Sequence, residues 1–196
     1  YESAKCLAFS AIAASQQGHA FEGLKLFSEA REIFVREKTR AWPSLIDLYR
    51  ALVFHNEGRF FEARRLAAEA LASFDSLNLQ SKAVLSQLLL ARIALQTEDL
   101  EQAFRHGNEA IARLAKLEAP VLTYQAHLLM GGLHSAAMNP DQAYSSNQLA
   151  RQALETLRSS LRGEELKIAF IKNRLEVYER LVELCINRND DPGARE

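Results

Sequence analysis

Apolar residues recur along the chain at the three- and four-residue spacing of an α-helix. Leu24, Phe27, Ala30, Ile33 and Phe34 would share one face of a helix, and the segments on either side show the same spacing. No stretch alternates apolar and polar residues as a half-buried strand would. The pattern predicts an all-α protein, with helices over residues 3–16, 20–37, 43–56, 60–77, 80–97, 99–117, 120–137, 140–160 and 163–187.

The helical pattern itself repeats with a stride of 40 residues. The clearest position is alanine in every copy: Ala30, Ala70, Ala110 and Ala150. A small residue stands seven positions earlier, at Gly23, Ala63, Ala103 and Ala143, and a large apolar residue four positions later, at Phe34, Phe74, Leu114 and Leu154. The preceding helix repeats a small residue at Ala11, Ala51, Ala91 and Gly131, and an apolar residue at Ala8, Leu48, Leu88 and Leu128. A fixed stride indicates stacked helical hairpins, in which small residues let helix backbones approach closely.

Turn-forming residues divide each copy into two helices, which we name the A helix and the B helix. Gly18 and Gly58 fall between the A and B helices, and Pro43, Pro120 and Pro140 fall in first turns. The predicted repeats are residues 1–39, 40–79, 80–119 and 120–160, and residues 161–196 hold a long helix of a truncated fifth repeat.

The arrangement resembles the tetratricopeptide repeat (TPR). In that family an A helix with a small residue at mid-length is followed by a turn and by a B helix with regularly spaced small residues. Gly58, Ala63, Ala67 and Ala70 reproduce the turn and the B helix. The resemblance covers residues 1 to about 160 and implies a right-handed superhelix of antiparallel hairpins, a TPR-like α-solenoid, with the A helices lining its inner wall.

The chain departs from the family in two respects. Its stride is 40 residues rather than 34, which implies helices that are longer by about one turn in total. Asp47, Gln87 and His127 also stand where the family carries a large apolar residue early in the A helix.

The segment from Leu157 to Asn187 resembles the one that follows the repeats in bacterial TPR proteins ending in a caspase-like CHAT domain. The matching residues are Phe170, Lys172, Val177, Tyr178, Glu179, Leu181 and Val182. The resemblance implies that a protease-like effector domain lies beyond Glu196, together with any catalytic residues that it has. The sequence also begins at Tyr1 and not at a methionine, so we expect it to be an interior part of a longer protein.

Composition and charge narrow the classes of function. The net charge of −1 provides no basic face for nucleic acid, and no apolar run reaches the roughly 18 residues that a membrane span needs. Cys6 and Cys185 lie in apolar helical patterns without a disulfide framework. We therefore expect two buried thiols in a reducing compartment, and a cytoplasmic protein.

No group of residues has the spacing of an active site. The five histidines include only one pair on a shared helix, His127 and His134, which are seven residues apart and lack the HExxH spacing of a zinc site. Gly131 and Gly132 lie in mid-helix, where they could not cradle a phosphate. We expect no enzyme activity, no cofactor and no metal.

A binding surface is the remaining expectation. By resemblance to the family, the peptide-binding residues on the A helices would be Tyr49, His55, Asn56, Arg92, Gln96 and Gln125. Arg92 interrupts an apolar run, so it is expected to be exposed or paired, either with a partner's carboxylate or with a glutamate of the chain. The alternative for all six positions is a solvated face that binds nothing.

Some members of the family bind the acidic C-termini of chaperones through two repeated positions of the A helix, and these positions are largely apolar in this chain. They read Ala8 and Ile12, Leu48 and Leu52, Leu88 and Arg92, and Leu128 and Gly132. The predicted groove is therefore mostly apolar and favours a hydrophobic or amphipathic ligand.

Two functions agree with these observations. The first is a non-catalytic interaction and sensor scaffold that binds a peptide or its own C-terminal effector, including regulation of a CHAT protease. The alternative is the TPR ligand-sensing region of a transcriptional regulator or signalling ATPase. A helical enzyme with a hidden site between helices is disfavoured by the missing motifs.

Overall fold

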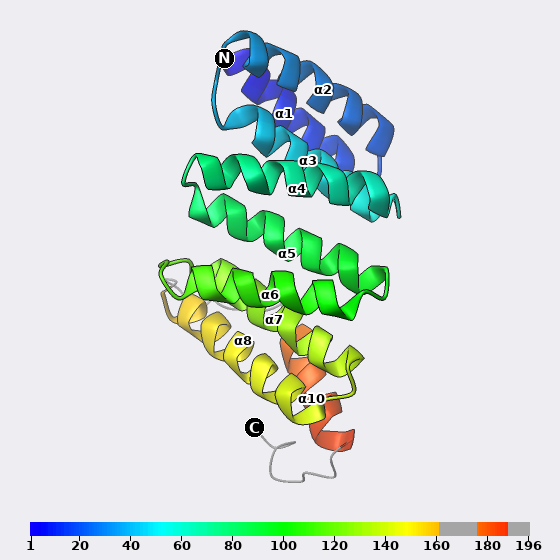
Figure 1. Cartoon of the computed structure of the whole chain (residues 1–196), viewed down its shortest axis with the longest axis vertical. Helices are drawn as coiled ribbons and strands as arrows, with labels where there is room; N and C mark the ends of the chain where they lie inside the picture. The colour runs from blue at the N-terminus through cyan, green and yellow to red at the C-terminus, as the bar shows by residue number, and fades with distance from the viewer. Residues whose placement is uncertain (161–175, 188–196) are drawn as a thin grey trace. The chain divides into compact units, whose positions relative to one another are not determined.

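The computed structural model describes residues 1–160 and 176–187, and every regular element in these ranges is a helix (Figure 1). The A helices are α1 (Glu2–Gln16), α3 (Trp42–Asn56), α5 (Gln80–Gln96) and α7 (Pro120–Ala136). The B helices are α2 (Ala20–Arg36), α4 (Phe60–Ser76), α6 (Leu100–Leu114) and α8 (Pro140–Ser160), and α10 (Glu176–Asn187) follows. The all-α prediction is confirmed. Of the predicted helix 163–187, residues 163–175 lie outside the described residues.

The chain forms two compact units, residues Tyr1–Glu98 and Asp99–Glu196. In the first unit α1 to α4 each contact the next helix along the chain, and α3 also contacts α1 and α5. In the second unit α7 contacts α6 and α8, and α8 contacts α10. Contacts between neighbouring hairpins are the stacking pattern of an α-solenoid, in which one hairpin alone cannot bury its apolar face.

Helix ends in the described residues recur every 20 residues, half the stride of the sequence pattern. The last turn of each such helix leads into a residue with positive φ: Gly18, Lys38, Gly58, Asn78, Glu98 and Met138. At the first of these turns the Gly18 N–H donates to the Ser15 carbonyl (3.2 Å) and the His19 N–H to the Ala14 carbonyl (2.9 Å). This is the Schellman arrangement that satisfies carbonyl groups at a helix C-terminus. Only the two glycine turns were predictable from residue type.

One helix ends earlier than its apolar pattern predicts. The sixth predicted helix runs to residue 117, but α6 ends at Leu114. Its last N–H groups, on Lys116 and Leu117, donate to carbonyls three residues back (3.1 and 3.0 Å), which tightens the end of the helix. Pro120 follows, and it moves Ala119 out of the helical conformation to φ −134° and ψ 66°.

The small residues of the repeat are core residues at points of close helix approach. All four alanines of the Ala30 column are buried, as are Ala11, Ala51, Ala91 and Gly131. A Cβ atom added to Gly131 would lie 2.4 Å from Nδ2 of Asn147 on α8. A larger residue at this position of α7 would therefore collide with its own hairpin partner.

Two of the polar residues at the family's apolar position are buried in the first unit. Asp47 of α3 accepts hydrogen bonds from Arg31 Nε of α2 (2.9 Å to each carboxylate oxygen) and from Arg50 Nη1 (3.0 Å). The carboxylate thereby ties the B helix of one repeat to the A helix of the next. Gln87 occupies the same column on α5 and is also buried.

The prediction that both cysteines are buried is wrong for Cys6. Both are free thiols, and Cys185 is 2% exposed, but Cys6 lies on an exposed face of α1. The helical pattern was misleading because the counterparts of Cys6 in the later repeats, Ile46, Ser86 and Ala126, are all fully buried. The first repeat exposes a face of its A helix that the other three repeats cover.

Candidate functional site

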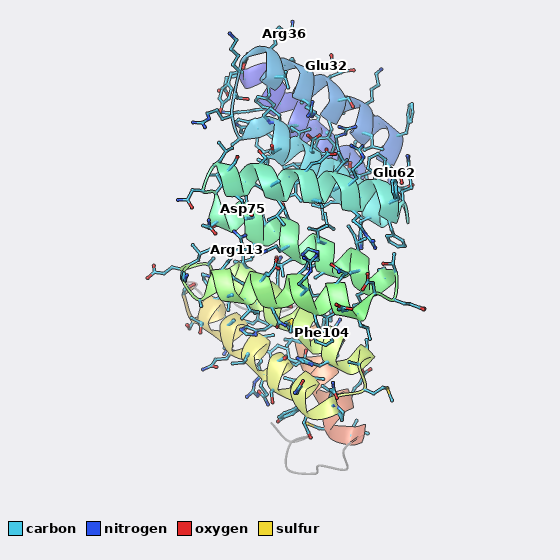
Figure 2. All side chains as sticks on the ribbon, in the orientation of Figure 1. Glu32, Arg36, Glu62, Asp75, Phe104 and Arg113 are labelled. Atoms are coloured by element: carbon cyan, nitrogen blue, oxygen red, sulfur yellow. The ribbon has the colours of Figure 1, made fainter. Side chains whose placement is uncertain are left out.

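In the first unit the A helices and the B helices differ in how many charged side chains they carry. The B helices α2 and α4 carry most of the charged side chains, including the labelled Glu32, Arg36, Glu62 and Asp75 (Figure 2). The A helices α3 and α5 carry only two each, which are Asp47 and Arg50, and Lys82 and Arg92. Each of these A helices has neighbours on more than one side, so only a narrow part of its surface reaches solvent.

That accessible surface is built from three columns of the repeat, which we name the A-helix stripe. Its members share one helix face because they are spaced by seven and four residues. They are Lys5, Ile12 and Gln16 on α1, Leu45, Leu52 and Asn56 on α3, and Leu85, Arg92 and Gln96 on α5. Because α3 contacts both α1 and α5, the three segments lie next to one another in the unit.

The A-helix stripe has a distinct chemistry. Its apolar members Ile12, Leu45 and Leu52 are half-buried, and Leu85 is 38% exposed. The amides of Gln16, Asn56 and Gln96 form an exposed polar row at one end. Its cations are Arg92 and Lys5, which pairs with Glu2 on the same helix (3.1 Å), and none of its own members is a carboxylate. Such a surface suits an amphipathic segment that carries negative charge.

Three of the predicted peptide-binding residues lie on the A-helix stripe. Asn56, Arg92 and Gln96 are exposed, and they come from the two neighbouring A helices α3 and α5. Gln125 is half-buried on α7 in the second unit, at the column of Lys5, Leu45 and Leu85.

The other two predicted residues lie elsewhere. The Tyr49 ring stacks on the Phe27 ring of α2, with centroids 5.8 Å apart and an interplanar angle of 4°. It therefore packs between two repeats. His55 is half-buried beside Phe60, with ring centroids 5.8 Å apart, and its Nδ1 lies 3.3 Å from Oδ1 of Asn56. That contact places His55 next to the polar row of the stripe.

Of the two columns that were expected to line the groove, the one with Ile12, Leu52 and Arg92 is accessible in the first unit, but the one with Leu48 and Leu88 is wrong. Leu48 and Leu88 are 3% and 2% exposed, so they belong to the core and are closed to a ligand. The stripe also contains Leu45 and Leu85, which are accessible and which the sequence reasoning did not single out. They could have been predicted from the repeat. Gln125 was a candidate, and Leu45 and Leu85 occupy the same position of the repeat 80 and 40 residues earlier.

The described residues contain no group of three or more His, Cys, Asp or Glu side chains that could hold a metal ion. Burial lowers the pKa of both His127 and His134, and the His134 ring lies 5.0 Å from the ring of Phe104 on α6. Phe104 is labelled in Figure 2. Burial therefore favours the neutral form of both imidazole rings. Within residues 1–160 and 176–187, no helix is both long enough and apolar enough to cross a membrane.

No protein-family model matches the sequence, and comparison with curated protein sequences finds no match. Solved structures do match the fold. BtubC (BKLC) from P. vanneervenii aligns over 99% of this chain and 82% of its own, with a TM-score of 0.75 and 19% identity. A candidate kinesin light chain from Podosopora anserina with nearly identical TPR-like repeats aligns over 97% of this chain and 89% of its own, with a TM-score of 0.68 and 18% identity. The chain therefore has a TPR-like α-solenoid fold.

Proposed function

We propose that this chain is a non-catalytic interaction scaffold that binds a peptide on the A-helix stripe of its first unit. The observation that carries the proposal is the chemistry of that stripe. The stripe presents accessible apolar side chains beside a row of exposed amides, Lys5 and Arg92 add positive charge, and none of its members is a carboxylate. The B helices of this unit instead carry charges of both signs, such as Arg65 and Glu69, which pair at 3.0 Å.

The stripe defines the chemistry of the ligand. Half-buried leucines favour a helical or extended segment with apolar anchor residues, because burying each anchor contributes roughly 1.5–3 kcal/mol before the cost of ordering the peptide. Arg92 is exposed, so its guanidinium can form a bidentate pair with a carboxylate of that segment. The exposed amides of Asn56 and Gln96 can hydrogen-bond to peptide backbone groups.

A charge reversal tests the site. A library of fluorescent amphipathic peptides with leucine anchors and one or two carboxylates is titrated with the chain, and binding is measured by fluorescence anisotropy. For the peptide that binds best, Arg92→Glu should weaken affinity about tenfold or more, because attraction becomes repulsion. Arg65→Glu, an exposed change on α4, is the matched control and should leave affinity within about twofold.

Two outcomes would contradict the proposal. One is an affinity that Arg92→Glu does not change, and the other is equal weakening by both variants. Circular dichroism and a thermal melt of each variant show whether the fold is intact, so that a loss of affinity can be assigned to the surface.

The finer hypothesis, that the ligand is the protein's own C-terminal effector and that this effector is CHAT-like, is supported by the sequence resemblance of Leu157–Asn187. Val177 and Leu181, two of its matching residues, lie on the buried face of α10. The coding sequence beyond Glu196 tests it directly. A caspase-like domain there would support regulation of a protease, whereas a helix-turn-helix or a Walker loop elsewhere in the reading frame would support the regulator or ATPase alternative. The cytoplasmic location also stays a prediction.

A further inference from the structure

The second unit contains a cavity of about 570 Å³, which we name the α7–α10 pocket. It is lined by the last turns of α7, the turn between α7 and α8, and one side of α10. Its volume falls within the range of about 300–1,000 Å³ that is typical of ligand sites. All of its lining residues belong to the second unit, so it is separate from the A-helix stripe of the first unit.

The pocket is open because the fourth repeat carries a glycine at Gly132. The same position holds Ile12, Leu52 and Arg92 in the earlier repeats. A Cβ atom added to Gly132 would lie 3.1 Å from Nη1 of Arg180 on α10. A side chain of the size found in the other three repeats would therefore displace Arg180 and occupy the pocket.

The pocket is not the surface on which a further helix would stack. One face of α10 is buried against α8, and a second side exposes Val182 and Ile186, which are 47% and 62% exposed. Arg180, Glu183 and Leu184 line the pocket from a third side, as their spacing along the helix requires. The apolar stacking surface of α10 is therefore Val182 and Ile186, and the pocket lies on another side of the helix.

The charges around the pocket leave one carboxylate uncompensated. Arg180 donates a hydrogen bond from Nη2 to Oε1 of Glu176 (2.5 Å) and one from Nη1 to the Leu128 carbonyl (3.1 Å), so its positive charge is balanced. Glu183 is exposed, and it forms no ion pair with any other residue that the structure describes. The pocket therefore carries a net negative charge and favours a cation.

We infer that the α7–α10 pocket binds a peptide segment through a lysine or arginine side chain. The cationic head of that side chain pairs with the Glu183 carboxylate, and the Ser135 hydroxyl and the Asn139 amide oxygen accept further hydrogen bonds from it. Its aliphatic stem lies along Met138 and Leu184, because long basic side chains bury their stems on apolar surfaces. Met138 is 85% exposed, and its unbranched side chain can adapt to the apolar neighbours of the basic residue.

A series of peptides tests the chemistry of the ligand. The peptides are Ala-Leu-X-Leu-Ala with blocked termini, in which X is arginine, lysine, norleucine or glutamate. Titration of the ¹⁵N-labelled full chain is followed by NMR. The arginine and lysine peptides should shift the amide signals of Gly132, Ser135 and Leu184. The norleucine peptide keeps the stem and lacks the charge, so it should bind about tenfold more weakly, and the glutamate peptide should not shift these signals.

Variants of the chain locate the effect. Glu183→Gln should lower the affinity for the arginine peptide about tenfold, to that of the norleucine peptide. Glu179→Gln is the matched control, because Glu179 is an exposed carboxylate of α10 outside the pocket, and it should change the affinity by less than about twofold. Gly132→Leu, which introduces the residue of the second repeat, should abolish binding. Arg92→Glu should have no effect on this site, which separates the result from the test of the proposed function.

Four results would overturn the inference. The first is the absence of shifts at the pocket with any peptide at millimolar concentration, and the second is equal affinity of the arginine and glutamate peptides. The third is equal weakening by Glu183→Gln and Glu179→Gln. The fourth is equal affinity of the arginine peptide and of N-acetylarginine amide, because the pocket would then be a site for a small cation. Circular dichroism shows whether Gly132→Leu keeps the fold, and if it does not, Glu183→Gln decides.

Discussion

The A helices α3 and α7 each contact a B helix on either side, and these two interfaces are built differently. Within a hairpin, the A helix packs on its own B helix through small residues, as where the backbone of Gly131 lies against Asn147 or that of Gly23 against Ser15. Between repeats, the B helix packs on the next A helix through larger groups that change from one repeat to another. The α2–α3 junction uses the Phe27–Tyr49 stack and the Arg31–Asp47 ion pair, whereas α8 and α10 meet through Glu155 and Tyr178.

The difference shows where the repeat is constrained. Close backbone approach admits little besides glycine and alanine, so the columns of Ala11, Gly23 and Ala30 hold only these two residues in all four copies. Side chains fill the wider junctions, and several combinations of volume and charge fill them equally well. The small-residue columns are therefore common to the repeats, whereas the residues at each junction between hairpins are particular to that junction.

The largest expected effect comes from replacing a residue of the α2–α3 junction by the residue at the same position of the next repeat. Phe27 is 1% exposed, and the same column in the second repeat is Ala67. Phe27→Ala should lower the free energy of unfolding by about 4 kcal/mol, because it leaves a cavity beside Tyr49 that nothing refills. Urea denaturation measures the change. A loss below about 1 kcal/mol would mean that junction residues can be exchanged between repeats after all.

A second test addresses the close approach within a hairpin. Gly131→Ala should destabilise the chain by about 2 kcal/mol, because the added Cβ collides with the buried Asn147 and outweighs the gain in helix propensity. The double variant Gly131→Ala and Asn147→Ala restores the pair found at Ala51 and Ala67 in the second repeat. It should recover most of the loss, which a double-mutant cycle in urea measures. If the losses in the free energy of unfolding simply add, the side chain of Asn147 is not what the added Cβ at residue 131 collides with.

The same comparison explains what could be predicted from the sequence. Helices, stride and hairpin core follow from residue type, since glycine and alanine at a fixed period indicate close packing. The turns at Lys38, Asn78, Glu98 and Met138 were not predictable individually, because their positive φ is imposed by the helix lengths and not by a glycine.

The candidate site was predictable only in part. The polar members Asn56, Arg92 and Gln96 stood out against an apolar background, and the structure exposes them. Periodicity alone could not separate the accessible Leu52 from the buried Leu48, because both belong to the apolar face of one helix. Which of them faces solvent depends on the neighbouring helices, which are set by the stack.

A third test removes the ion pair of the α2–α3 junction. Asp47→Ala should cost about 1.5 kcal/mol, less than for a fully buried pair, because the Arg31 and Arg50 side chains are 40% and 25% exposed and can be hydrated. Asp47→Leu introduces the residue that the first repeat carries at this column and should recover about half of that loss through apolar packing. If leucine proves no better than alanine, the junction depends on charge rather than on volume.

The smallest expected effect concerns the junction between α8 and α10. The Tyr178 hydroxyl donates a hydrogen bond to the Glu155 carboxylate, and Tyr178→Phe should cost about 1 kcal/mol at neutral pH. Burial, together with this bond, raises the pKa of Tyr178 from 10.0 to about 12, while the bond lowers the pKa of Glu155. The contribution of Tyr178 to stability is therefore complete below its unfolded pKa and is lost as the pH rises through about 12. The contribution of Glu155 is complete above its unfolded pKa and is lost as the pH falls through its lowered folded value.

Absorbance at the tyrosinate band should show a tyrosine that ionises near pH 12 in the native chain and is missing in Tyr178→Phe. If that step is unchanged in the variant, Tyr178 is not the tyrosine held by the junction, and the bond to Glu155 does not stabilise it.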